Sequence, residues 1–150
     1  MELVVQNINY LILINQQRSD QGEMADVDNW QPKKTIEELR NLNLSLEDTN
    51  KFSEILTSFQ IVGGKDGMET TRRILQKLLS YDLSLKLNWT GRNNKTSFSS
   101  FTNIVNLIFV AVRKNPAAKT CTQVEVQNVI KTWLRNAGDR EGGRAKRRTN

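Results

Sequence analysis

The sequence has 150 residues, 37% of them hydrophobic, with 22 Lys and Arg against 16 Asp and Glu, which allows one domain with a sizeable core and solvated ends. No apolar run approaches the roughly 20 residues of a membrane helix, and the absence of His with a single cysteine, Cys121, excludes zinc fingers and internal disulfides. The N-terminus lacks the positive charge and cleavage site of a secretory signal, so we expect an intracellular protein.

The first 44 residues are expected to form an arm and an acidic linker outside the main domain. Residues 2–17 carry apolar side chains at helical spacing, although residues 11–14 fit the start of a strand equally well. Such a short element either packs on its own domain or associates with a partner chain, so a homodimer through this segment is one alternative. Residues 18–34 are polar and acidic, which is typical of a linker.

Capping sequences predict the first two helices. Thr35, with Glu38 three residues later, is a capping box and predicts a short helix. A second helix is expected to begin at Ser45, with Asp48 three positions on, and to stop at residues 63–64, which are both glycine. Its core-facing residues are expected to be Phe52, Ile55, Leu56 and Phe59.

The next helix is expected to run from Asp66, which repeats the capping spacing with Glu69, to about Ser80. Its expected apolar face consists of Met68, Ile74, Leu75, Leu78 and Leu79. The apolar residues of the segment 83–89 alternate with period two, as in a strand, but we expect no second strand to pair with them. The sequence therefore predicts a short helix with an extended exit, followed by a polar loop over residues 90–97.

Two longer helices complete the expected fold. The first begins at Ser99 or Ser100 and ends before Pro116. Its inward residues are expected to be Ile104, Val105, Ile108, Phe109 and Val112. The second begins at Thr122, where a glutamate three residues later completes a capping box, and ends at Gly138. Its buried stripe is expected to be Val126, Val129, Ile130, Trp133 and Leu134.

The predicted fold is all-α, a compact bundle of five or six short helices over residues 45–140, followed by a disordered basic tail over residues 141–150. Residues 1–64 contain five Lys and Arg against ten Asp and Glu, whereas residues 65–150 contain 17 against six. Such an excess is larger than solubility requires and presents a positive field to a polyanion. The charge distribution therefore favours nucleic acid as the partner.

Four sequence blocks carry a resemblance to a known family. In chain order they are RRILQKLLS (72–80), NWTGRNNK (88–95), AVRKNP (111–116) and WLRNAGDR (133–140). Together they resemble the invertebrate domain-of-unknown-function family 4806 of insects and cnidarians, over about residues 45–140. The chain has Asn93 and Asn94 where members of that family often have glycines.

The same order of elements is similar to the BEN domain, an all-α module of transcriptional regulators. This similarity implies a BEN-like fold that binds duplex DNA in the nucleus, in transcriptional regulation or chromatin association. The residues expected to contact DNA are Arg72, Arg73 and Lys77 on one helix, Arg92, Asn93 and Lys95 in the polar loop, and Lys131, Arg135 and Arg140 on or just past the last helix.

Each of these groups also has a simpler interpretation. The three cations of the earlier helix are equally typical of a solvated face, and the polar loop is equally typical of an exposed turn. Arg113 and Lys114 are better explained by the negative end of a helix dipole than by DNA. The tail cations after residue 140 fit either nonspecific DNA affinity or a nuclear-import signal.

The residue inventory argues against an enzyme. A metal-dependent nuclease needs two or three converging carboxylates, but the basic half has only six acidic residues, of which Asp66, Glu69 and Glu125 are expected to cap helices. We therefore expect no catalytic residue, metal, cofactor or small-molecule substrate. The alternative to DNA binding is a protein-interaction or oligomerisation module that has no contact with nucleic acid.

Overall fold

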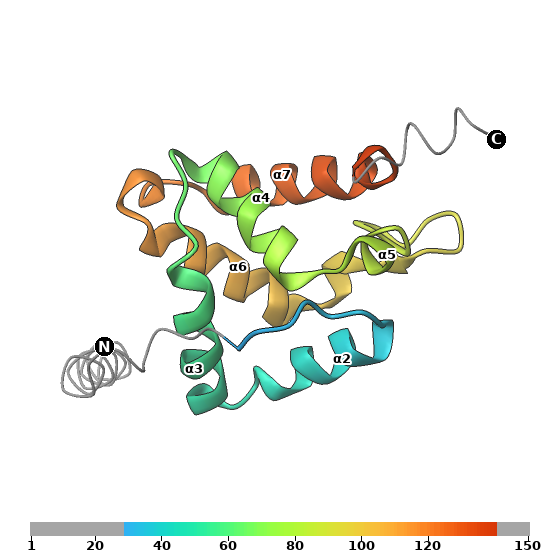
Figure 1. Cartoon of the computed structure of the whole chain (residues 1–150), viewed down its shortest axis with the longest axis horizontal. Helices are drawn as coiled ribbons and strands as arrows, with labels where there is room; N and C mark the ends of the chain where they lie inside the picture. The colour runs from blue at the N-terminus through green and yellow to red at the C-terminus, as the bar shows by residue number, and fades with distance from the viewer. Residues whose placement is uncertain (1–28, 141–150) are drawn as a thin grey trace. The chain divides into compact units, whose positions relative to one another are not determined.

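The computed structural model describes residues 29–140, which form a mainly helical fold (Figure 1). The helices are α2 (Ile36–Ser45), α3 (Thr49–Gln60), α4 (Gly67–Leu78), α5 (Tyr81–Ser84), α6 (Thr102–Lys114) and α7 (Gln123–Arg135). Two short strands, β1 (Leu87–Asn88) and β2 (Thr96–Ser97), and the 3-10 turns η2 (Phe98–Ser100), η3 (Pro116–Ala118) and η4 (Ala137–Asp139) complete this part of the chain. The prediction of an all-α bundle is confirmed. The expected N-terminal element and basic tail lie outside the described residues.

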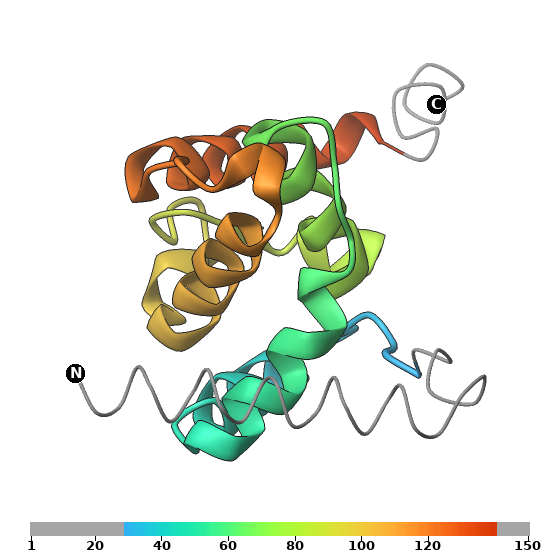
Figure 2. The same cartoon turned by 90° about the vertical axis from the view of Figure 1, so that its left-hand side faces the viewer.

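Helix α6 lies between two pairs of helices. Helices α4 and α7 pack side by side on one side of it, and α2 and α3 lie on the other (Figures 1 and 2). Its buried residues are Ile104, Leu107, Ile108, Ala111 and Val112. Val105 and Phe109, which were expected to point inward, are only partly buried. The core is thus built around α6, and α4 and α7 both pack on this helix.

Side-chain caps begin α2, α4 and α7 as predicted. The cap residues Thr35, Asp66 and Thr122 each accept a hydrogen bond from the amide three positions on, at 3.1, 2.8 and 3.2 Å. Only α7 has the full capping box, because Glu125 accepts in return from the Thr122 amide at 3.4 Å. In α2 and α4 the corresponding glutamate accepts instead from the amide just before the cap residue, at 2.7 Å.

Helix α3 begins later than predicted. Ser45 is the last residue of α2, where its hydroxyl donates to the carbonyl of Leu42 at 2.8 Å. The cap of α3 is Asp48, whose carboxylate accepts from two amides of the first turn, at 2.9 and 3.5 Å. The expected start at Ser45 is therefore wrong, since α2 continues until Leu46 is buried in the core.

Helix α6 begins after Phe101 rather than at Ser99 or Ser100, and its own cap residue supplies no side-chain hydrogen bond. Its first amides are satisfied by Asn43 of α2, whose side-chain oxygen accepts from Asn103 and Ile104 at 3.0 and 3.1 Å. Asn103 in turn donates from its side chain to the Asn43 carbonyl at 2.9 Å. This cap comes from a residue distant in sequence, so a local pattern does not reveal it.

The first turn of α4 also differs from the prediction. Met68 was expected in the core, but it is 54% exposed. The inward positions of this turn belong to Thr70 and Thr71, whose hydroxyls donate to carbonyls four residues earlier at 2.6 and 2.7 Å. Because these hydroxyls are satisfied within the helix, their burial costs little. Met68 is left on the side of α4 that faces α7 and the solvent.

The segment after α5 does find a partner. Leu87 and Asn88 form β1 and pair in parallel with Thr96 and Ser97 of β2. The short helix and extended exit are confirmed, but the expectation that no second strand exists is wrong. The partner strand is the returning end of the same loop, and the buried Leu87 anchors the pair in the core.

The compact helical unit begins at Gln31, whereas the sequence placed its start at residue 45. Helix α2 packs on α6, with Leu39 fully buried. Lys33 is tied to the end of α4, because its amide donates to the Leu78 carbonyl at 2.8 Å and its carbonyl accepts from the Ser80 amide at 2.9 Å. The last residues of the expected linker therefore belong to the unit. Within residues 29–140, no helix has the length and apolar character needed to cross a bilayer.

Candidate functional site

Residues 89–95 form a loop whose ends are joined by the β1–β2 pair. Asn88 holds the loop from within, because its side-chain oxygen accepts from the Gly91 amide at 2.5 Å and its side-chain nitrogen donates to the Arg92 carbonyl at 2.8 Å. Across the base, the Ser97 hydroxyl donates to the Trp89 carbonyl at 2.9 Å. A loop closed by its own hydrogen bonds has little conformational entropy left to lose on binding a partner.

The tip of this loop is a two-residue turn. Asn93 and Asn94 have positive φ angles of 59° and 62°, and the Lys95 amide donates to the Arg92 carbonyl at 3.1 Å. Two consecutive left-handed residues inside such a hydrogen bond indicate a type I′ turn, which Asn tolerates better than most side chains. The asparagines thus adopt the backbone that glycines would adopt here. Residues that flank this kind of turn lie opposite each other, so the exposed Arg92 and Lys95 are neighbours.

The base of the loop contacts α7. The Lys131 ammonium lies 5.5 Å from the centre of the Trp89 ring, and β1 packs on the same helix. Arg135 follows Lys131 by four residues, which places both side chains on one face of α7. The loop lies beside the C-terminal half of α7 (Figures 1 and 2). We call Arg92, Lys95, Lys131 and Arg135 the basic cluster.

The charges of the basic cluster are not neutralised by the described part of the chain. Three of the four side chains are exposed, and Lys131 is partly buried against Trp89. The ion pairs within residues 29–140 join Glu37 to Arg40, Lys51 to Glu54 and Glu69 to Arg73. None of them includes a member of the cluster. These four cations are therefore not paired with a carboxylate of the described residues.

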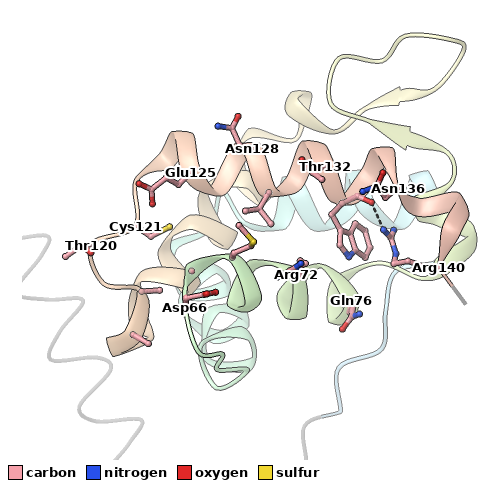
Figure 3. Close-up of a pocket in the computed structure, with 16 residues that line it drawn as sticks. Asp66, Arg72, Gln76, Thr120, Cys121, Glu125, Asn128, Thr132, Asn136 and Arg140 are labelled. Atoms are coloured by element: carbon pink, nitrogen blue, oxygen red, sulfur yellow. Dashed lines mark hydrogen bonds between the residues drawn. The ribbon is translucent and has the colours of Figure 1, made fainter.

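The three cations of α4 do not form one surface, although the sequence grouped them. Arg73 pairs with Glu69 at 3.0 Å. The hydrogen bond from the Lys65 amide is the main cause that lowers the pKa of the Glu69 carboxyl, and the Arg73 charge adds to it. Lys77 donates to the carbonyl of Ser58 in α3, and its ammonium lies 5.5 Å from the centre of the Phe59 ring. Arg72 lies apart from these contacts, on the side of α4 that lines a pocket shared with α7 (Figure 3).

Arg140 is part of the packing around α7. This helix ends at Arg135, before the predicted stop at Gly138, which lies in η4. The chain then turns so that the Arg140 guanidinium lies 3.6 Å from the centre of the Trp133 ring and donates to the Trp133 carbonyl. Arg140 therefore closes the C-terminal end of α7 instead of extending into solvent with the basic cluster.

A groove with a volume of about 760 Å³ runs between α4 and α7 (Figure 3). Its floor is apolar and includes Met68, Val129 and Trp133. Arg140 lies toward one end, Arg72 lies near the middle, and Asp66, Cys121 and Glu125 lie toward the other end. Neither the exposed methionine nor the groove was expected, because both depend on how two helices distant in sequence pack side by side.

The remaining cations of the basic half lie elsewhere. Arg113, at the end of α6, donates to the carbonyl of Lys119 at 3.0 Å and stacks on Phe109. Both Arg113 and Lys114 occupy the last turn of α6, as the helix-dipole interpretation expects. This group lies near η3, at the N-terminal end of α7, whereas the basic cluster lies near its C-terminal half (Figure 1). The cations thus form separate groups rather than one strip.

The acidic and sulfur side chains of residues 29–140 do not assemble a metal site, because no three of them converge. Asp66 and Glu125 cap helices, as predicted. Burial, and then the neighbouring Glu125, raise the pKa of the Cys121 thiol, which favours the unreactive protonated form at neutral pH.

The sequence profile of the family described as Domain of unknown function (DUF4806) matches residues 28–111. This range begins earlier than the resemblance over residues 45–140 and ends within α6, so it contains the loop of the basic cluster but not α7. No curated protein matches the chain, and no solved structure does. Since the profile covers more than half of the sequence, the chain belongs to the DUF4806 family.

Proposed function

We propose that the domain binds duplex DNA, chiefly through its phosphates, with the basic cluster as the contact surface. The observation that carries this proposal is the contact between the loop and α7, in which Lys131 lies against Trp89 at the base of the loop. The loop and this side of α7 carry four cations, Arg92, Lys95, Lys131 and Arg135. They come from segments well separated in sequence, and none is in an ion pair within residues 29–140. Phosphate oxygens are the partners that such solvated cations favour.

The loop of residues 89–95 also holds its two cations on a backbone that hydrogen bonds fix in place. Its turn brings the backbones of Arg92 and Lys95 together at an exposed tip, while Asn88 fixes the loop behind them by donating to the Arg92 carbonyl and accepting from the Gly91 amide. Two cations presented in this way reach neighbouring phosphates without first being ordered. Asn93 is exposed between them and offers an amide, which can both donate to and accept from a base edge.

Four of the cations that the sequence suggested as DNA contacts have other contacts or another location in the structure. Arg73 and Lys77 already stabilise α4 and its packing on α3, and Arg140 packs on Trp133. Arg72 faces the groove. We therefore assign DNA contact to the basic cluster and Asn93, and leave the cations of α4 and Arg140 out of the assignment.

The proposal extends to a nuclear role in transcriptional regulation or chromatin association. Its support is the resemblance of the order of elements to that of BEN domains, a fold-level analogy, together with the basic second half of the chain. The tail cations and the expected N-terminal self-association would add to such a role, but both lie outside the described residues. The rival function, a protein-interaction module, finds support in a different feature, the groove between α4 and α7.

Titration of a fluorescent duplex with the full chain at several salt concentrations tests the proposal. Four phosphate contacts predict that log affinity falls against log salt with a slope of roughly −3.6, and tail contacts would steepen it. The double variant Arg92→Ala/Lys95→Ala should flatten the slope by about 2 and reduce the affinity at least about tenfold. Lys114→Ala/Lys119→Ala removes the same charge from two other exposed positions and should change the affinity less than about threefold.

An absent salt slope, or equal losses for the two double variants, would refute the basic cluster as the DNA contact surface. Selection from a random duplex pool with the full chain then separates two modes of binding. An enriched motif that is lost in Asn93→Ala indicates base contact from the loop tip, and a pool without enrichment indicates binding through phosphates alone.

A further inference from the structure

The groove between α4 and α7 is built from one continuous face of each helix. On α4 its lining runs from Asp66 to Gln76, and on α7 from Glu125 to Asn136 (Figure 3). At 1.5 Å per residue, the α4 face is about 15 Å long, which is about three helical turns. Gly67 lets the start of α4 lie close to the segment before α7, since a Cβ there would lie 2.7 Å from the Cys121 sulfur.

The floor of this groove leaves apolar surface uncovered. Met68 is 54% exposed, although it lies between buried residues of α4 and the partly buried Val129 of α7. Trp133 lies further along the same floor, covered on one face by Arg140. A methionine in such a position adapts its flexible side chain to a partner's shape, as methionines of peptide-binding grooves do.

The ends of the groove differ in charge. Arg72 lies midway along α4 and Arg140 lies past the C-terminal end of α7, whereas Asp66 and Glu125 lie at the N-terminal ends of the two helices. Arg72 is exposed and in no ion pair within residues 29–140. Both carboxylates already accept backbone hydrogen bonds as caps. Of these charged groups, Arg72 is therefore the one that a partner's carboxylate can pair with.

We propose that this groove binds an amphipathic helix of a partner protein. Two apolar side chains of the partner, one turn apart, would cover Met68 and Val129, and an acidic side chain would pair with Arg72. The length of the groove matches about three turns of such a helix, and its open side suits a helix better than a small ligand, which a pocket encloses on most of its surface.

This binding site is separate from the proposed DNA surface. The α7 residues that line the groove include Val129, Thr132 and Trp133, but neither Lys131 nor Arg135. Lys131 and Arg135 follow the lining residues Asn128 and Thr132 by three positions, so they lie on the side of α7 that adjoins the groove. The domain can therefore hold an acidic amphipathic helix in the groove while the basic cluster on the adjoining side of α7 contacts phosphates.

A selection experiment with the full chain tests the proposal. A displayed library of random peptides of about 14 residues, long enough for three to four turns, is selected on wild-type protein. The expected winners carry apolar residues at i and i+4 or i+3 and at least one Asp or Glu near one end. Failure to enrich any peptide, or enrichment of peptides without this pattern, would overturn the proposal.

Matched variants locate the binding site. Met68→Gln should weaken the selected peptide about tenfold or more, whereas Val124→Gln, which changes an exposed apolar residue outside the groove lining, should leave its affinity within about twofold. Both residues are largely exposed, so both variants should fold, which circular dichroism checks. Equal effects of the two variants would place the peptide elsewhere.

A double-mutant cycle tests the charge pairing. Arg72→Gln and the peptide's Glu→Gln should each weaken binding roughly three- to tenfold, and the two together should cost little more than either alone. Additive losses would contradict the pairing. Light scattering of wild type and Met68→Gln completes the test, because a change of oligomeric state between them would assign the groove to a second copy of the chain and refute a heterologous partner.

Discussion

The two faces of α7 present opposite kinds of surface. On one face, Lys131 and Arg135 join the loop cations in a charged surface that is largely exposed to solvent. On the other face, Val129 and Trp133 line an apolar groove in which the nearby Arg140 is already stacked and hydrogen-bonded. Cations that lie within a few residues of each other thus differ in use, since Arg135 of α7 is exposed while Arg140, past the end of the helix, packs within the domain.

The difference predicts two kinds of binding. Solvated cations bind polyanions through counterion release, so affinity for the basic cluster should fall steeply as salt increases. An apolar floor binds by removing surface from water, which salt affects little. Salt dependence therefore separates the two surfaces in one protein, and variants on either face of α7 can break or confirm the division.

The largest effect is expected from reversing the charges of α7 in the basic cluster. Lys131→Glu/Arg135→Glu replaces two attractions to phosphate with two repulsions, and we expect a loss of duplex affinity on the order of a hundredfold at low salt. Fluorescence anisotropy with the full chain measures it. Lys114→Glu/Lys119→Glu makes the same change in net charge at the η3 end of the domain and should cost less than about fivefold. Similar losses in both variants would mean that net charge, and not the cluster, drives binding.

A smaller effect should separate Arg140 from Arg135, which the sequence had grouped. Arg140→Ala removes the stacking on Trp133 and the hydrogen bond to its carbonyl, so we expect the free energy of unfolding to fall by about 1–2 kcal/mol. Arg135→Ala removes an exposed side chain and should lower it by less than about 0.5 kcal/mol. Urea denaturation measures both values.

Duplex affinity should show the reverse order for these two variants. Arg135→Ala removes a phosphate contact and should flatten the salt slope by about 1, whereas Arg140→Ala should leave the slope unchanged. If Arg140→Ala flattens the slope as much as Arg135→Ala does, the division of α7 into a charged face and a packed face is wrong.

Local signals in the sequence predicted most helix starts, with the exception of α3, whose cap is Asp48 and not Ser45. The caps at Thr35, Asp66 and Thr122 each depend on a residue three positions away, and all three are confirmed. The start of α6 was misplaced because its cap, Asn43, lies far away in the chain. The β1–β2 pair was missed because its second strand, Thr96 and Ser97, has no apolar residues to reveal it, although the segment that contains β1 alternates as in a strand.

The sequence predicted which residues of the candidate site are cations, but not which of them lie near one another in the fold. The sequence shows that residues 65–150 are rich in cations, and helical spacing relates Lys131 to Arg135. It does not show that Trp89 brings the loop onto α7, nor that Lys77 is bound to the end of α3. The groove was unpredictable for the same reason. Its exposed Met68 was expected in the core, because the sequence does not show that Thr70 and Thr71 occupy the buried positions beside it.

The smallest expected effect concerns Cys121, which lies at the acidic end of the groove. Burial is the main cause that raises the pKa of its thiol, and Glu125 adds to it. The folded chain therefore favours the neutral thiol, and this contribution to stability is present below the pKa of the unfolded chain and lost as pH rises through the folded value. At about pH 8, alkylation by iodoacetamide should be several times slower in the folded chain than in the urea-unfolded chain.

The same reaction reports which face of α7 is occupied. Glu125→Gln keeps a capping side chain but removes the negative charge, so alkylation should become faster. A peptide bound in the groove should slow the reaction, because it covers the thiol, whereas duplex DNA on the basic cluster should not. Protection of Cys121 by DNA and not by the selected peptide would contradict both assignments, because it would place DNA in the groove and the peptide elsewhere.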